Sequence, residues 1–212
     1  MPRRFRFLAL ASALLGLAAA ARPAQGPTPP KSGYAPVNGL KMYYEVHGQG
    51  RPLVLLHGSF LNIDMAFGQL IPELAKSRQV IALEFQAHGR TADIDRPITV
   101  RGLADDVAAL LQYLNAGPAD VFGYSLGGVV ALDDFTREAR GVRAPTLLIV
   151  GDSDGILPEH VAEMFRLRGG GANGDLGGRS PAQLAVFPAT SHVAVMMHTD
   201  WLLAILPPFL ND

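Results

Sequence analysis

The residues best suited to chemistry form the stretch Gly123-Tyr124-Ser125-Leu126-Gly127, in which a serine stands between two glycines. An apolar run precedes this stretch and an apolar segment of helical character follows it, so we expect Ser125 on a sharp turn between a strand and a helix. Such a turn strains the backbone, and side chains at the flanking positions would collide with their neighbours, which explains the glycines. The turn lifts the serine hydroxyl clear of the sheet. It also leaves the N–H of Leu126 at a helix N-terminus, where it can bind a developing negative charge.

A serine hydroxyl is a poor nucleophile at neutral pH, so it needs a base, and the base needs a partner that fixes its tautomer. Asp154 and His192 fit these roles, because each follows directly after a predicted strand. In a parallel sheet, the chemistry gathers at the carboxyl ends of the strands. Asp152 and His198 are the alternatives. We interpret Asp152 as a turn residue at a strand end and His198, inside the terminal apolar segment, as a structural histidine.

The elements that would position these residues alternate between strands and helices. Residues 37–40 predict a hairpin turn that leads into a half-buried strand at 41–47, and continuous apolar runs predict parallel strands buried on both faces. The clearest helix, at 101–115, has Asp105 and Asp106 on its polar face. This alternation predicts an α/β fold with a mostly parallel, doubly wound sheet and helices on both faces. The predicted buried strands are 52–56, 80–83, 119–122, 145–150 and 184–187. The other predicted helices are 70–74, 127–139, 158–167 and 200–206. The glycine-rich stretch 168–181 predicts a loop.

The composition limits the classes of protein that the chain can represent. Its 212 residues are enough for one α/β domain with a sizeable core and too few for two. The formal net charge of −1 indicates neither nucleic acid nor an anionic membrane surface as a partner. The chain has no cysteine, which excludes disulfides, thiolate metal sites and a cysteine nucleophile. No Asp, Glu and His set has metal-ligand spacing and no dinucleotide fingerprint follows the first strand, so we expect no metal and no cofactor.

The first residues predict export. Arg3, Arg4 and Arg6 precede an apolar run at 7–21 that ends in small residues, which is the pattern of a signal peptide. We therefore expect a signal peptide at 1–21, a proline-rich linker at 22–33 and the folded domain at 34–212. The run is too short for a comfortable membrane span. This pattern favours a periplasmic or secreted protein, with an uncleaved N-terminal anchor as the alternative.

Taken together, these motifs make the chain resemble the α/β-hydrolase superfamily, in its serine esterase and cofactor-free haloperoxidase-like branch. The resemblance implies Ser125 as the nucleophile, Asp154 as the acid and His192 as the general base. It also implies an oxyanion hole formed by the backbone N–H groups of Ser59 and Leu126. The resemblance runs from about residue 37 to the C-terminus and is carried by residues 55–58, 87–91, 123–127, 145–154 and 191–192.

The chain departs from this family between Ser125 and Asp154. Relatives usually hold a helix, a further strand and a lid in this interval, whereas one predicted helix fills it here, so a sheet strand and the cap domain are missing. A parallel crossover needs only about a dozen residues. We therefore expect the sheet to close the gap, which would bring the Asp154 strand about 4.8 Å closer, next to the Ser125 strand. Without a lid the site should be open and shallow, and bare apolar surface would favour a homodimer.

The sequence supports two hypotheses about function. In the first, the protein is a serine hydrolase that cleaves small-molecule carboxylic esters through a Ser-His-Asp triad and an acyl-enzyme; a lactonase or perhydrolase would use the same triad. In the second, it is a non-catalytic, lidless α/β-hydrolase-like binding protein. The presence of Ser125, Asp154 and His192 favours the first hypothesis, because nothing structural requires all three. The missing strand and lid favour the second.

Overall fold

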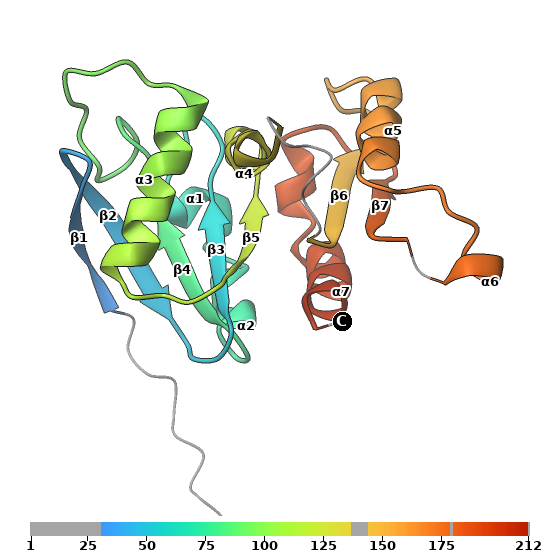
Figure 1. Ribbon diagram of the computed structural model, residues 1–212, viewed down its shortest axis with the longest axis horizontal. Coiled ribbons are helices and arrows are strands. Elements are labelled where there is room, and N and C mark those ends of the chain that lie inside the picture. Colours follow the sequence, from blue (N-terminus) through green and yellow to red (C-terminus); the bar gives the residue numbers. More distant parts are fainter. Residues whose placement is uncertain (1–30, 137–143, 179, 212) are drawn as a thin grey trace, which may run out of the picture.

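The computed structural model describes residues 31–136, 144–178 and 180–211 (Figure 1). The expected signal peptide and most of the expected linker, up to residue 30, lie outside the described residues. The first strand begins at Lys31, inside the segment expected to be a linker. In the part of the chain that is described, no helix is both long and apolar enough to cross a bilayer.

Five strands form the first sheet, in the order β1-β2-β4-β3-β5. β1 and β2 form the predicted hairpin, whose two turn residues, Asn38 and Gly39, have φ values of +46° and +87°. β2 is antiparallel to β4, whereas β3 is parallel to both β4 and β5. The alternation of strands and helices thus correctly predicts the parallel centre of this sheet. The strands are β1 (Lys31–Val37), β2 (Leu40–His47), β3 (Pro52–Leu56), β4 (Gln79–Leu83) and β5 (Asp120–Gly123).

Helices cover both faces of the first sheet (Figure 1). Because successive side chains of a strand point to opposite faces, Val54 and Leu56 of β3 pack in the apolar cluster of α3 and α4. Leu53 and Leu55 pack in a second cluster, with α1, α2 and α7. The helices predicted at 70–74, 101–115 and 200–206 correspond to α2, α3 and α7, and the helix predicted at 127–139 corresponds to α4. Its expected last residues, 137–139, lie outside the described residues. The helices are α1 (Ile63–Phe67), α2 (Ile71–Leu74), α3 (Val100–Tyr113), α4 (Leu126–Thr136) and α7 (Thr199–Leu210).

A separate sheet of two parallel strands, β6 (Thr146–Gly151) and β7 (Ala182–Phe187), follows α4. The expectation that the Asp154 strand would pair with the Ser125 strand is wrong. Within the described chain, β5 pairs with β3 alone and β6 pairs with β7 alone. The physical reason lies in the packing of β6: the partly buried side chains of Leu147 and Ile149 pack against the apolar cluster that includes Leu202 and Leu206 of α7, and this contact positions the second sheet. α5 (Pro158–Leu167) packs on β6 and β7, and α6 (Gly174–Gly177) lies in the predicted loop.

One expectation about α3 is also wrong. Asp105 is exposed and pairs with Arg101 one helical turn away, as predicted. Asp106, however, is fully buried. Its carboxylate accepts hydrogen bonds from the guanidinium of Arg96 and, at 2.9 Å, from the side-chain amide of Asn38. A charged side chain can be buried when such partners satisfy it, and the periodicity of α3 does not reveal them.

Candidate active site

The ends of β3 and β5 bring the serine turn and the expected oxyanion loop together. The two strands are in register, with Leu56 opposite Gly123, and the N–H of Tyr124 donates to the carbonyl of Leu56 at 3.0 Å. The loops that follow both strands therefore start side by side. A Cβ atom added to Gly58 would lie 3.2 Å from the Cβ atom of Ser125, so the first loop passes in contact with the serine.

Ser125 occupies a turn of the strained kind that the sequence predicts. Its φ of +53° lies in the left-handed region, which is unfavourable for a residue with a side chain. A Cβ atom on Gly123 would lie 2.3 Å from the carbonyl oxygen of Gly127, and one on Gly127 would lie 2.0 Å from that of Leu56. Both glycines are therefore needed for α4 to start against β3. Since α4 begins at Leu126, the N–H of this residue has no acceptor inside the helix.

The buried side chain of His57 orients the peptide group of Ser59. The N–H of Phe85 donates to His57 Nε2 at 3.1 Å, so the proton of the neutral ring is on Nδ1, which donates to the carbonyl of Gly58 at 2.8 Å. Burial lowers the pKa of His57, which keeps the ring neutral. The N–H of a trans peptide points opposite to its carbonyl. The bond to Gly58 therefore directs the Ser59 N–H away from His57.

The ends of β6 and β7 bring Asp154 and His192 together. These strands are also parallel and in register, with Gly151 opposite Phe187. His192 Nδ1 lies 3.0 Å from Oδ2 and 3.1 Å from Oδ1 of Asp154. A carboxylate can only accept here, so the proton of the neutral ring is on Nδ1, and Nε2 is left as an acceptor. The Asp154 side chain is 4% exposed and that of His192 is 35% exposed, so the imidazole keeps a face open to solvent.

The alternative residues, Asp152 and His198, have contacts of their own. Asp152 Oδ1 accepts from the N–H of Thr190 at 3.1 Å, and hydrogen bonds from the backbone of this loop hold the pKa of Asp152 below its usual value. The ring of His198 stacks on Trp201 with 4.1 Å between centroids and lies 3.3 Å from the hydroxyl of Thr190. These contacts agree with the interpretation of Asp152 as a turn residue and His198 as a structural histidine.

Ser125 and His192 come from different sheets, and Tyr124 contacts both. The Tyr124 ring stacks on His192, with 5.4 Å between centroids and an interplanar angle of 27°, and its hydroxyl donates to the His192 carbonyl at 3.3 Å. Within the described residues, no hydrogen bond joins the Ser125 hydroxyl to His192. Such bonds are often long in unliganded sites and tighten when substrate binds. Sequence reasoning missed the role of Tyr124, because its partner lies 68 residues away.

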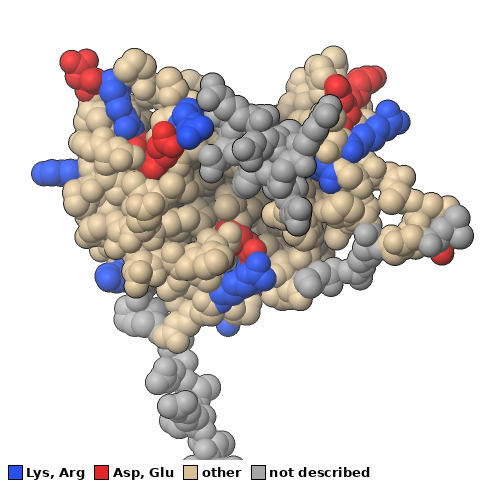
Figure 2. All heavy atoms as spheres, viewed as in Figure 1, with Lys and Arg blue, Asp and Glu red and all other residues tan. Residues whose placement is uncertain are grey.

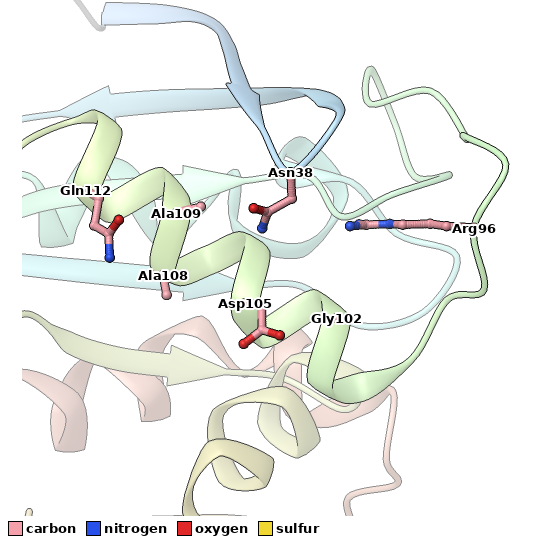
Figure 3. Close-up of a pocket in the computed structure, with 7 residues that line it drawn as sticks. All are labelled: Asn38, Arg96, Gly102, Asp105, Ala108, Ala109 and Gln112. Atoms are coloured by element: carbon pink, nitrogen blue, oxygen red, sulfur yellow. The ribbon is translucent and has the colours of Figure 1, made fainter.

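Two surface hollows lie away from these residues. One is lined by α3 together with Asn38 and Arg96, which point toward one another from the β1–β2 turn and the loop before α3 (Figure 3). The guanidinium of Arg96 is already paired with Asp106 there, so this hollow offers no unpaired cation for a ligand. The other hollow follows β7 and α7. Neither hollow is lined by Ser125, Asp154 or His192.

The surface around the candidate site is open and apolar. Phe60, in the loop after β3, is 94% exposed, and Val193, next to His192, is 67% exposed. On the face of the molecule shown in Figure 2, charged side chains of both signs are scattered rather than gathered into one patch. Among the described residues, no group of three or more His, Cys, Asp or Glu side chains is arranged to hold a metal ion.

The chain shares sequence with known proteins over about half of its length. Residues 53–142 match the family model described as "Alpha/beta hydrolase family". The dihydrolipoyllysine-residue acetyltransferase component of the acetoin cleaving system of Pseudomonas putida is 39% identical over 113 residues, which are 52% of this chain and 29% of that protein. The pimeloyl-[acyl-carrier protein] methyl ester esterase of Neisseria meningitidis serogroup B is 36% identical over 94 residues, 44% of this chain and 34% of that protein.

The fold is also shared with solved structures. The enol-lactonase from Burkholderia xenovorans LB400 superposes with a TM-score of 0.70 over 84% of this chain and 100% of its own, at 18% identity. This likeness shows the fold alone. The matched segment covers less than half the length of these curated relatives, for example 29% of the Pseudomonas putida protein and 41% of a non-heme haloperoxidase from Rhodococcus erythropolis.

Proposed function

Because residues 53–142 of this chain match the α/β-hydrolase family and its fold is that of solved hydrolases, we propose that it is a serine hydrolase that cleaves carboxylic esters. The observation that carries the proposal is the hydrogen-bonded pair of Asp154 and His192, whose imidazole stacks on Tyr124, the residue directly before the strained turn of Ser125. The 36% identity to a methyl ester esterase over 94 residues supports an ester as the substrate, and a lactone would undergo the same acyl transfer. Perhydrolysis would use the same residues.

In the proposed reaction, Ser125 Oγ attacks the carbonyl carbon of the ester while His192 Nε2 takes its proton. Asp154 holds the Nδ1–H of His192 and stabilises the imidazolium that forms. The N–H groups of Ser59 and Leu126 donate to the carbonyl oxygen as it becomes an oxyanion. The imidazolium then gives its proton to the leaving alkoxide, which departs as the alcohol and leaves an acyl-enzyme. Water, activated by the same imidazole, releases the acid and restores Ser125.

A second candidate function is a non-catalytic binding protein of the same fold. The observation that favours it is the division of the site between two sheets, with no hydrogen bond between Ser125 and His192 in the described part of the chain. The charge and apolar pattern of residues 1–21 supports a further part of our proposal, that the protein acts after export.

Hydrolysis of p-nitrophenyl esters, from acetate to octanoate, separates the two functions. The purified protein should release p-nitrophenolate, and Ser125→Ala should lower kcat by about 10³-fold or more, because the nucleophile is gone. Ser77→Ala, at an exposed serine on the loop before β4, is the matched control and should leave the rate unchanged. A folded protein without activity, or equal activity in the protein and in Ser125→Ala, would favour the binding protein.

A further inference from the structure

We infer that Tyr124 is a positioning residue, which aligns His192 with Ser125 across the boundary between the two sheets. The inference rests on the proposed function, in which His192 acts as the base. It concerns the residue between the first glycine and the serine of the motif, a position where the motif itself accepts any side chain.

The alignment of Ser125 with His192 depends on side chains, because the two sheets share no backbone pairing. Three hydrogen bonds between described residues connect the first sheet and its helices to the chain after residue 144. Two of them hold α7, from Thr199 to Gln69 at 3.0 Å and from Arg78 to the carbonyl of Leu210 at 3.3 Å. The third runs from the Tyr124 hydroxyl to His192 and is the one at the candidate site.

The Tyr124 side chain lies between the oxyanion loop and the imidazole. A Cβ atom on Gly58 would come within 3.0 Å of the Tyr124 ring, which therefore packs against that loop. The ring also stacks on His192, at an angle of 27° between planes. The backbone of Tyr124 continues directly into Ser125. One residue thus contacts the oxyanion loop and the base, and carries the nucleophile as its neighbour in the chain.

The hydroxyl of Tyr124 is suited to the role of donor. Burial raises the pKa of Tyr124, and the negative charge of Asp154 raises it further, so the hydroxyl keeps its proton at neutral pH. The bond to the carbonyl of His192 restrains the backbone of that residue, and the stacked rings restrain the plane of the imidazole. The carbonyl and the hydroxyl of Ser191 accept from the N–H groups of Val195 and Ala194, so the backbone next to His192 has support of its own. Among the described residues, the imidazole of His192 itself is restrained by its contacts with Asp154 and Tyr124.

Kinetics of two Tyr124 variants test this role. Tyr124→Phe keeps the stacked ring and removes the hydrogen bond, whereas Tyr124→Leu removes both. We expect kcat for p-nitrophenyl butyrate to fall about 3–10-fold in the first and about 10–100-fold in the second, with KM nearly unchanged and with an altered pH profile, because a displaced base loses catalytic geometry. Tyr113→Phe, at an exposed tyrosine of α3, is the control and should leave kcat and the profile unchanged.

The NMR signals of the His192 ring protons supply a readout that needs no activity, with assignment by His192→Gln. The stacked Tyr124 ring should shift a His192 signal upfield in the unmodified protein and in Tyr124→Phe, and this shift should disappear in Tyr124→Leu. Loss of the shift together with unchanged kcat would overturn the inference and leave the proposed function standing. An inactive protein in which Tyr124→Leu abolishes the shift would support the alignment while the proposed function fails. Absence of the shift from the unmodified protein would overturn the inference outright.

Discussion

His192 Nδ1 lies 3.0 Å from Asp154 Oδ2, and this pair forms although neither residue follows a strand that is hydrogen-bonded to the strand of Ser125. The register of β6 and β7 and the hydrogen bonds of Asp152 and Ser153 to Thr190 bring the two loops together, so the pair is complete within the second sheet. In a continuous sheet, backbone pairing between the strands would also fix the distance between the Asp154–His192 pair and Ser125. Here that distance depends on the packing of α7 and on Tyr124.

Substitution of Asp154 and of its neighbour Asp152 should have different effects on kcat, because only Asp154 contacts His192. Asp154→Asn should lower kcat by about 10³–10⁴-fold, because an amide does not stabilise the imidazolium and can favour the wrong tautomer of His192. Asp152→Asn is the matched control, because this carboxylate binds the Thr190 backbone instead, and its kcat should stay within a few-fold of the unmodified protein. Steady-state kinetics on one ester measure both. If kcat fell more in Asp152→Asn than in Asp154→Asn, Asp152 rather than Asp154 would be the acid of the triad.

Neighbouring aspartates of α3 predict a similar contrast in stability. Asp106→Ala leaves the guanidinium of Arg96 and the amide of Asn38 without their acceptor, so it should lower the free energy of unfolding by about 3–5 kcal/mol. Asp105→Ala removes only an exposed ion pair with Arg101 and should change the free energy of unfolding by less than about 1 kcal/mol. Urea denaturation measures both values. Similar losses in the two variants would contradict the burial of Asp106.

The buried ring of His57 predicts a dependence of stability on pH. Burial lowers the pKa of His57 in the folded state, below the value of about 6.5 expected in the unfolded chain. The neutral ring therefore contributes its full stability above about pH 6.5, and this contribution is lost as the pH falls through the folded value. One proton can change the free energy of unfolding by at most about 1.4 kcal/mol per pH unit.

Urea denaturation between pH 7 and pH 5 tests this expectation on three proteins. As the pH falls, the free energy of unfolding of His57→Gln should decrease less than that of the unmodified protein, whatever the absolute stability of the variant. His160→Gln, at an exposed histidine, should keep the full decrease. Burial raises the pKa of Glu84, but hydrogen bonds from Arg90 outweigh it and the net shift is downward. The stability that this group contributes is therefore lost mainly below its unfolded pKa of about 4.3, outside the range of the test. Equal slopes in His57→Gln and the unmodified protein would contradict a neutral buried ring.

The sequence predicts the elements with local signals well, and these carry most of the candidate site. A continuous apolar run marks β3, and the paired glycines 123 and 127 mark the turn of Ser125, because the constraint that selects them acts within a few residues. The sequence missed two short helices, α6 in the predicted loop and α1 before α2. The case of α1 shows why. It has five residues, too few for apolar periodicity to show, and its visible signal is the N-cap Asn62, which accepts from the N–H of Met65.

Features that depend on distant partners could not be predicted in the same way. Asp106 is buried because Arg96 and Asn38 reach it, and the pattern of α3 contains neither. The second sheet stays separate because Leu147 and Ile149 pack with α7, whereas crossover length alone allows pairing with β5. The stacking of Tyr124 on His192 likewise joins residues that no local pattern relates.

If Ser125 is an activated nucleophile, it should react covalently with a fluorophosphonate. The purified protein, Ser125→Ala and His192→Gln would be treated with the probe, digested, and analysed by peptide mass spectrometry. We expect one phosphonate adduct, on the peptide that contains Ser125, with no adduct in Ser125→Ala and slow labelling in His192→Gln. A folded protein that remains unlabelled, or that carries the adduct on another serine, would contradict this expectation.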